Sequence, residues 1–232
     1  IFEFVCKFLG GVFRGALKNC PPDELSKMPS VLARVKRVKE FRLASKKEQT
    51  RRRADTPALF AEDRYIAATS ILIPMLSSEN REYVPIGFID KDTVASNLAS
   101  VIPNGDLFIF GVITSSVCMG WMRTVGSRMK SDYRFSASLV YNTFPWADFS
   151  DGERAKIEKT AQAILDARGK YPNATLAQLY NELTMPADLR KAHRENDKAV
   201  MAAYGFDMKM TESECVAELF KLYEKLCRSS SL

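Results

Sequence analysis

Three charged residues at alternate positions, Lys130, Asp132 and Arg134, offer the most specific chemistry in this sequence. Apolar groups fill most of the other nearby positions (Met129, Tyr133 and Phe135). In an extended segment successive side chains point to opposite faces, so the three charges would share one face. Lys and Arg donate to guanine O6 and N7, and Asp accepts from the cytosine amino group, so such a row could read base edges in a major groove. The alternative is an exposed strand whose opposite charges compensate one another.

A second charged feature is a run of ten Lys and Arg between Arg34 and Arg53 that contains only two acids, Glu40 and Glu48. Cations this dense repel one another unless an anion neutralises them, and a phosphate backbone does so with release of counterions. The phosphate-binding candidates are Arg34, Arg37, Arg42, Lys46, Lys47, Arg51, Arg52 and Arg53, with Arg123 and Arg128 as further candidates. The alternative is a solvated helix face followed by a loop.

The net charge of +6 is unevenly distributed. Residues 1–149 contain 21 Lys and Arg against 15 Asp and Glu, which gives +6, whereas residues 150–232 contain 13 of each and are neutral. A basic first part joined to a neutral second part is typical of proteins with an anionic partner such as nucleic acid.

Composition excludes several classes of protein. With 232 residues, 46% apolar and 27% charged, the chain resembles an ordinary globular protein that can bury a core. It has no apolar run of about 20 residues and no signal peptide, so we expect a cytoplasmic protein without membrane contact. Five scattered cysteines and one histidine argue against a disulfide framework, a metal site or a catalytic triad. We expect His193 to be an ordinary residue on a helix surface, and the chain to be a piece of a longer polypeptide.

Alternation and punctuation predict the elements that would position these residues. Pro29 introduces a helix with apolar residues at three- and four-residue steps (Val31, Leu32, Val35, Val38, Phe41). Strands of one sheet are expected at 65–68, 70–76 and 83–89, followed by a helix over 106–128 and a strand over 136–144. Phe144 to Ser150 is expected to be a linker, because Pro145 ends the preceding pattern.

The last 83 residues, 150–232, are predicted to be helical. Ser150 with Glu153 forms a capping box for a helix that ends near Arg168, and Thr211 with Glu214 begins another that runs to about Cys227. Between them, a short helix is expected over 175–183, and a longer one is framed by Pro186 and Gly205. Core faces are expected at Ile157, Ala161, Ile164 and Leu165, and at Leu219, Leu222, Tyr223 and Leu226.

Several motifs in the same order resemble those of MmeI-like DNA methyltransferases, the single-chain type IIL restriction-modification enzymes. The residues that carry this resemblance are 120–136 (GWMRTVGSRMKSDYRFS), 140–146 (VYNTFPW), 77–87 (SSENREYVPIG), 183–193 (LTMPADLRKAH) and 202–205 (AAYG). The resemblance covers essentially the whole chain. It implies a parent protein that methylates adenine N6 with S-adenosylmethionine, and base choice set by side chains in this region. It further implies that Lys130 and Asp132 read one base pair, and that Arg134 works with Leu98, beside Asn97, on another.

The catalytic motifs of such an enzyme are not found in the sequence. An amino-methyltransferase needs an Asn/Asp-Pro-Pro-aromatic motif to hold the flipped base, and Cys20-Pro-Pro-Asp23 does not supply one. A glycine-rich cofactor loop is also missing. We therefore expect an α+β protein without a catalytic site or a cofactor of its own: a DNA target-recognition domain with a mixed sheet over 1–149 and a small all-helical domain over 150–232. The expected partners are double-stranded DNA and an upstream methyltransferase domain of the same polypeptide. The alternative is a protein-interaction module that docks on an acidic partner without touching DNA.

Overall fold

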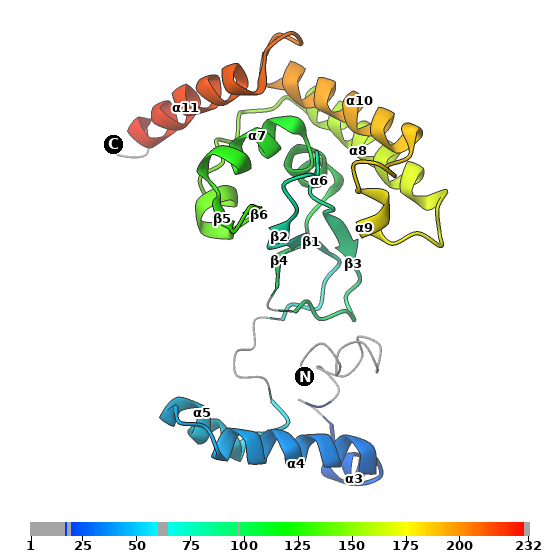
Figure 1. Cartoon of the computed structure of the whole chain (residues 1–232), viewed down its shortest axis with the longest axis vertical. Helices are drawn as coiled ribbons and strands as arrows, with labels where there is room; N and C mark the ends of the chain where they lie inside the picture. The colour runs from blue at the N-terminus through cyan, green and yellow to red at the C-terminus, as the bar shows by residue number, and fades with distance from the viewer. Residues whose placement is uncertain (1–16, 18–19, 60–64, 97, 230–232) are drawn as a thin grey trace. The chain divides into compact units, whose positions relative to one another are not determined.

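The computed structural model describes residues 17, 20–59, 65–96 and 98–229 (Figure 1). Contacts within the chain divide it into two compact units. Unit 1 contains Ile1–Ala68 and Asp90–Ser96, and unit 2 contains Thr69–Ile89 and Asn97–Leu232. Helices and short antiparallel sheets together confirm the expected α+β class.

Unit 1 is helical in the part that the structure describes. Its elements are α3 (Pro22–Ser26), α4 (Pro29–Leu43), α5 (Glu48–Arg52) and the 3-10 turn η1 (Arg53–Asp55). The helix expected from Pro29 is confirmed, with the proline at a position where its missing N–H costs nothing. The expected apolar stripe is only partly buried: Val31 is covered, whereas Phe41 remains 69% exposed.

Two small antiparallel sheets lie in unit 2, where one sheet was expected. The first has the order β3-β1-β4, formed by Gly87–Ile89, Ser70–Pro74 and Ala99–Pro103. The second has the order β2-β6-β5, formed by Leu76–Ser77, Asp132–Arg134 and Ser127–Met129. The prediction missed β4 and was wrong for 65–68, which is not a strand. Met75, between β1 and β2, marks the change from one sheet to the other.

The single helix expected over 106–128 is two helices, α6 (Leu107–Ile113) and α7 (Ser116–Val125), bent by 56° from each other. Thr114 and Ser115 cause the break, because their hydroxyls donate to the carbonyls of Phe110 and Val112. The Ser115 hydroxyl also accepts from Cys118 N and so begins the second helix. Among the described residues no single helix is long and apolar enough to cross a membrane, and this bent pair meets only the length and composition of a span.

The strand expected over 136–144 is also wrong, because Ala137–Tyr141 forms a short π-helix, η2. Ser136 begins it by accepting from Leu139 N, and Asn142 N donates back to Ala137 O at 2.8 Å. The pattern of apolar residues did not distinguish this helical turn from a strand, because a five-residue segment is too short to separate the two-residue period of a strand from the period of a helix.

The helical region follows its capping signals closely. Its helices are α8 (Asp151–Gly169), α9 (Leu176–Leu179), α10 (Ala187–Ala203) and α11 (Glu212–Ser229). Both expected capping boxes are present, Ser150 with Glu153 and Thr211 with Glu214. Gly205, just past α10, has a φ of +70° that favours glycine. The helix expected over 175–183 is shorter than predicted, and Leu226 is exposed rather than part of the core.

One hydrophobic core joins the sheets and helices of unit 2. Gly111 of α6 allows close approach to α8, since a Cβ there would lie 2.6 Å from Ile157 Cγ2. The expected linker is packed into the same core: Phe144 is buried, and Trp146 contacts the rings of Phe108 and Phe144. Unit 2 therefore contains residues from both sides of the expected boundary between 149 and 150.

Candidate nucleic-acid interface

Lys130, Asp132 and Arg134 lie on a β-hairpin and not on one extended strand. Strands β5 and β6 pair antiparallel with Met129 opposite Asp132 and Ser127 opposite Arg134. Lys130 and Ser131 form the turn, and Lys130 has a φ of +58°. A positive φ at the first of two turn residues is the pattern of a type II′ hairpin, which suits the twist of the strands. The expectation that all three charges share one extended face is therefore wrong.

The hairpin nevertheless leaves the three charged groups available. Asp132 and Arg134, two residues apart on β6, still share one face, while Lys130 projects from the turn. Lys130 is exposed and the other two are half-buried. None of the three side chains has a hydrogen bond or ion pair with another described residue. The unoccupied donors and acceptors of this hairpin thus face outward.

On the opposite face, the hairpin is held by Arg128 and Tyr133. The Arg128 guanidinium lies 4.3 Å from the centre of the Tyr133 ring and donates to its hydroxyl at 3.1 Å. It also donates to Ser131 O and lies 3.8 Å from a carboxylate oxygen of Glu79. Arg128, a phosphate candidate from the sequence, is therefore used largely in fixing the hairpin.

The structure brings Leu98 next to β6 through Met75. Met75 N donates to Leu98 O at 2.9 Å, and Met75 O accepts from Phe135 N at 3.0 Å. Only Met75 therefore lies between the backbone of Leu98 and the end of β6. Leu98, which the family resemblance pairs with Arg134, is 58% exposed. Asn97, the remaining base-reading candidate, lies outside the described residues.

Gly126 allows the hairpin to start directly after α7. A Cβ at this position would lie 2.4 Å from Met122 O and 3.1 Å from Arg134 O. Backbone cannot yield at such distances, so only glycine lets the chain leave the helix against β6. Phe135, at the end of β6, is 1% exposed and ties the base of the hairpin to the core.

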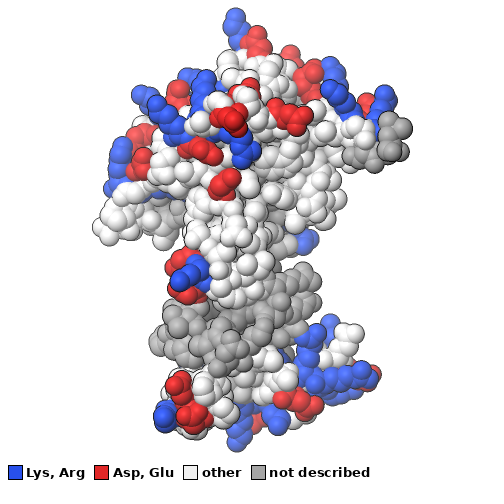
Figure 2. All heavy atoms as spheres, turned by 180° about the vertical axis from the view of Figure 1, so that it is seen from behind, with Lys and Arg blue, Asp and Glu red and all other residues white. Residues whose placement is uncertain are grey.

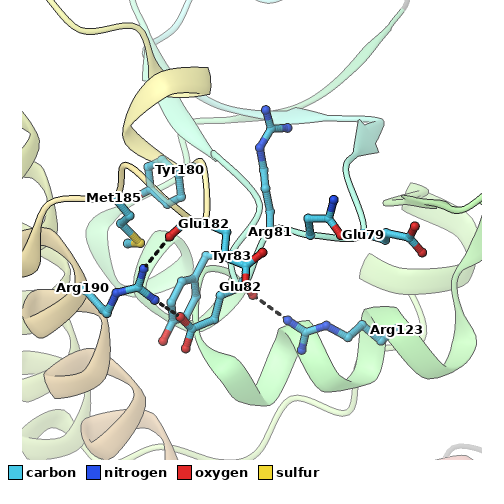
Figure 3. A pocket seen from close by; sticks show the side chains of 10 residues that line it. Glu79, Arg81, Glu82, Tyr83, Arg123, Tyr180, Glu182, Met185 and Arg190 are labelled. Carbon is cyan, nitrogen blue, oxygen red and sulfur yellow. Dashed lines mark hydrogen bonds and ion pairs between the residues drawn. The ribbon is translucent and has the colours of Figure 1, made fainter.

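The segment that follows β2 is fastened by side chains from three helices, and Figure 3 shows two of them, Arg123 and Arg190. Arg123 of α7 donates to Glu82 O at 2.6 Å, and Arg190 of α10 pairs with the Glu82 carboxylate at 2.8 Å. Arg168 of α8 donates to Ile86 O at 2.7 Å. Residues Glu79 to Tyr83 of this segment line an open pocket of about 460 Å³, which Arg123, Tyr180, Glu182, Met185 and Arg190 complete.

A buried carboxylate anchors the same segment from beneath. Asp197 of α10 accepts from the Tyr83 hydroxyl at 2.6 Å and from Ser116 N at 2.7 Å. Burial raises the pKa of Asp197 to about 6, although both hydrogen bonds act to lower it. The carboxylate thereby joins the loop after β2 to the start of α7, the helix that leads into the hairpin.

His193 was expected on a helix surface, and this prediction is wrong. It is fully buried, stacks on Tyr83 with ring centroids 4.1 Å apart, and lies 2.6 Å from the Tyr180 hydroxyl. Burial lowers the pKa of His193 to about 3, and the Arg168 charge acts in the same direction. The ring is therefore neutral, with Nδ1 buried and without a partner among the described residues. One histidine in a polar helical sequence gives no sign of burial, which depends on where α10 packs.

Most of the phosphate candidates of unit 1 are accessible cations. Lys46, Lys47 and Arg53 are exposed, and no partner for their side chains lies among the described residues. Arg37 bonds only to its own helix, Arg52 pairs with Glu48, and Arg51 donates to the carbonyls of Ser45 and Lys46. Arg34 is half-buried, and its Nη1 has no partner in the described part of the chain.

Arg42 has a different task from the other cations of unit 1. It is 7% exposed, and its guanidinium donates to the carbonyls of Arg53 (2.7 Å), Thr56 (2.9 Å) and Leu59 (2.7 Å). Burial, then the Arg53 charge, lowers its pKa. Both of its terminal nitrogens donate inside the protein, so Arg42 is not available as the phosphate contact that its charge suggested. Arg123 is similar, since it pairs with Glu212 at 2.5 Å while holding Glu82 O.

Comparison with known proteins places both parts of the chain in one family. The family model for the target recognition domain of MmeI matches residues 16–148, and the model for the C-terminal domain of MmeI matches residues 149–230. DNA methyltransferase A of Bacillus subtilis (strain 168) is 36% identical over an alignment of 228 residues that covers 95% of this chain and 26% of that protein.

A solved structure of the type IIL restriction-modification enzyme MmeI in complex with DNA is similar in both sequence and fold. It is 46% identical, with a TM-score of 0.87 over 93% of this chain and 28% of that one. The chain therefore spans about a quarter of the length of the relatives it matches.

Proposed function

The chain belongs to the MmeI family of target recognition and C-terminal domains, and on that basis we propose that it selects the DNA sequence on which a larger DNA methyltransferase acts. The single observation that carries this proposal is the β5–β6 hairpin, which turns three unpaired charged groups outward. A two-stranded ribbon fits a major groove, where base pairs differ in their donors and acceptors. The segment after β2, which borders this hairpin, is fastened to the three helices α7, α8 and α10, so its geometry is fixed before DNA arrives.

Within the hairpin, Lys130 and Asp132 are the proposed readers of one base pair. A lysine ammonium donates to guanine, and a carboxylate accepts from cytosine. Arg134, with Leu98 and Asn97, is the proposed reader of another. The backbone path from Leu98 through Met75 to Phe135 supports this second pair, because it keeps Leu98 next to β6.

Phosphate contacts are proposed for the exposed cations of unit 1, which are Arg37, Lys46, Lys47, Arg51, Arg52 and Arg53, and for the half-buried Arg34. Such contacts add affinity without choosing a sequence. Arg42 and Arg123 are left out, since protein carbonyls and carboxylates take up their donors. Arg128 contributes by holding the hairpin, and only its exposed edge is free for DNA.

For the parent protein we propose adenine-N6 methylation with S-adenosylmethionine, carried out by an upstream domain of the same polypeptide in the cytoplasm. The relative named as a DNA methyltransferase supports this reaction class. In this division of labour, residues 1–149 recognise the target and residues 150–232 brace it. Arg168, Arg190 and Asp197 support the bracing role, because all three come from the helical part and hold the segment after β2.

The first test is a titration of the chain with duplex DNA at increasing salt. We expect weak binding that falls steeply, with the logarithm of the affinity decreasing by about 0.9 per phosphate contact for each tenfold rise in salt. Binding that is independent of salt would contradict a phosphate-gripping surface. Capture of an acidic protein that excess duplex DNA fails to displace would favour a protein-interaction module instead.

The second test exchanges the proposed readers, Lys130→Asp with Asp132→Lys, in the full-length gene. Asp tolerates the positive φ at position 130 better than most residues, so the hairpin is expected to persist. Sequencing of methylated bases in a host that carries the gene should show a new base at one position of the site. Ser131→Ala, in the same turn but without charge, is the matched control. An unchanged methylated site in the exchanged variant would refute the assignment.

A further inference from the structure

The most distinctive cation of unit 2 outside the hairpin is Arg81, because nearly all of its neighbours are already paired. Arg128 lies against Glu79, Arg190 pairs with Glu82, and Arg123 with Glu212. The Arg81 side chain has no hydrogen bond or ion pair with another described residue and is half-exposed. In Figure 3 its guanidinium extends away from Arg123, Arg190 and Glu82.

Hydrogen bonds hold the backbone before Arg81 and the side chain of Tyr83 after it. Arg81 N donates to Ser78 O at 3.1 Å, and Asn80 N lies 3.4 Å from the Ser78 hydroxyl, which makes a β-turn of Ser78 to Arg81. Two residues later Tyr83 is 2% exposed and bonded to Asp197. A free guanidinium on a braced turn is pre-organised for a ligand, because binding need not order the backbone.

This turn lies at the edge of the sheet that contains the hairpin. Strand β2, which ends at Ser77, pairs with β6 through Leu76 opposite Arg134 and Ser77 opposite Tyr133. Neighbouring strands are about 4.8 Å apart, so β2 lies roughly 5 Å from β6 and 10 Å from β5. A major groove is about 12 Å wide. If the β5–β6 hairpin occupies the groove, one of its phosphate rims passes over β2 and the turn that follows.

We propose that Arg81 is a DNA phosphate contact that fixes the register of the duplex against the β5–β6 hairpin. This inference rests on the proposed function and adds to it a residue that the charge pattern of the sequence did not single out. The ligand is the sugar-phosphate backbone and not a base, since Arg81 lies beside the hairpin face rather than on it. The guanidinium would replace counterions on one phosphate, with Arg128 and Arg190 keeping the nearby carboxylates neutralised.

The test compares Arg81→Gln with the wild-type chain in fluorescence anisotropy titrations. The probes are poly(dA·dT) and poly(dG·dC) duplexes at several KCl concentrations, so no knowledge of the recognised site is needed. We expect affinity to fall on the order of tenfold on both duplexes, as for loss of one charged hydrogen bond. The salt slope should decrease by about 1. Arg81→Lys, which keeps the charge, should retain the wild-type slope.

Lys159→Gln is the matched control, since Lys159 is an exposed cation of α8, a helix that packs on α6 and α10. If Arg81→Gln and Lys159→Gln give equal affinities and salt slopes, Arg81 does not contact the phosphates. The inference about Arg81 then fails, whereas the proposed function stands. A loss confined to one duplex would make Arg81 a base reader and would also overturn it. If the wild-type chain binds neither duplex, the proposed function fails with it. Circular dichroism melting should be the same for the wild type and the three variants, because the Arg81 side chain has no hydrogen bond or ion pair with another described residue.

Discussion

The arginines of the two units differ in what they do, although the sequence presents them alike. In the larger unit, Arg123, Arg168 and Arg190 hold carbonyls, a tyrosine hydroxyl and carboxylates that lie far away in the sequence. In the smaller unit most cations lie on one helix and the turn after it, and their contacts are local or lacking among the described residues. Over the helices of the larger unit, Figure 2 shows basic and acidic side chains intermingled. Counting charge therefore identifies a basic region, and pairing decides which of its cations are available to an anionic partner.

The largest effect expected from this contrast is that of Asp197→Ala in unit 2. The change leaves the Tyr83 hydroxyl and Ser116 N buried without an acceptor, and each such group costs about 1–3 kcal/mol. We expect the free energy of unfolding to fall by roughly 3 kcal/mol, measured by urea unfolding followed through tryptophan fluorescence. Glu195→Ala, on the exposed side of the same helix, should change it little. Equal effects of the two variants would refute the anchoring role of Asp197.

Next in size is Arg42→Leu, which tests the one arginine that is buried among the described cations of unit 1. Three carbonyls lose a charged donor, so we expect a loss of roughly 2 kcal/mol in local stability. Amide hydrogen exchange over residues 53–59 is the measurement, because only the segment held by Arg42 should open. Arg37→Gln, which removes a bond to the same helix, is the control. If both variants exchange like the wild type, Arg42 is not structural.

A third prediction separates the two titrating groups beneath the pocket by pH. The pKa of His193 is lowered to about 3 from an ordinary value of 6.5. Between these two pH values the folded protein binds fewer protons at His193 than the unfolded chain does, so the contribution of His193 to stability rises with pH. The pKa of Asp197 is raised to about 6 from an ordinary value of 3.8. Between these two pH values the folded protein binds more protons at Asp197 than the unfolded chain does, so the contribution of Asp197 to stability falls as pH rises. Between about pH 4 and 6 the two slopes oppose each other.

His193→Gln should remove one of these slopes. Relative to the wild type, its free energy of unfolding should fall by about 1.4 kcal/mol for each pH unit between about 4 and 6. Urea unfolding at half-unit steps of pH gives the measurement. Parallel curves for variant and wild type would show that His193 titrates as in the unfolded chain, contrary to its burial.

The smallest effect is expected for Arg52→Gln in unit 1. Arg52 pairs with Glu48 at 2.5 Å, but both side chains are more than half exposed, and such pairs contribute about 0.5 kcal/mol or less. Thermal unfolding should hardly change, whereas the salt slope of DNA binding should decrease by about 1. If Arg52→Gln clearly lost stability and bound DNA as the wild type does, Arg52 would serve the fold of unit 1 and not DNA binding.

Short-range signals in the sequence were sufficient for much of the fold. The capping boxes at Ser150 and Thr211 and the stop at Gly205 fixed three helix ends, because each depends on residues within one turn. The same local logic failed at Thr114 and Ser115, whose hydroxyls broke an apolar helix, and at 136–144, where a short apolar run formed a π-helix. In both places the competing structures differ by only a few hydrogen bonds.

The candidate site shows the same division. Residue types and spacing led to the proposal of Lys130, Asp132 and Arg134 as base readers, which stays a prediction. The premise of one extended strand was wrong, since nothing in SRMKSDYR marks its turn with glycine or asparagine. Arg81 went unnoticed because it stands alone between acids. Only the partners of those acids show that it is free.

By itself, the sequence determined the α+β class, the helical second part, the basic character of the first and the hairpin residues that could read bases. Each of these follows from composition or from neighbours within a few residues. Tertiary structure alone decided that Arg42 and Arg123 serve the protein, that His193 is buried, and that Met75 joins Leu98 to β6. The reason is physical: a donor binds whichever acceptor folding brings within about 3 Å, and chain order does not encode that distance.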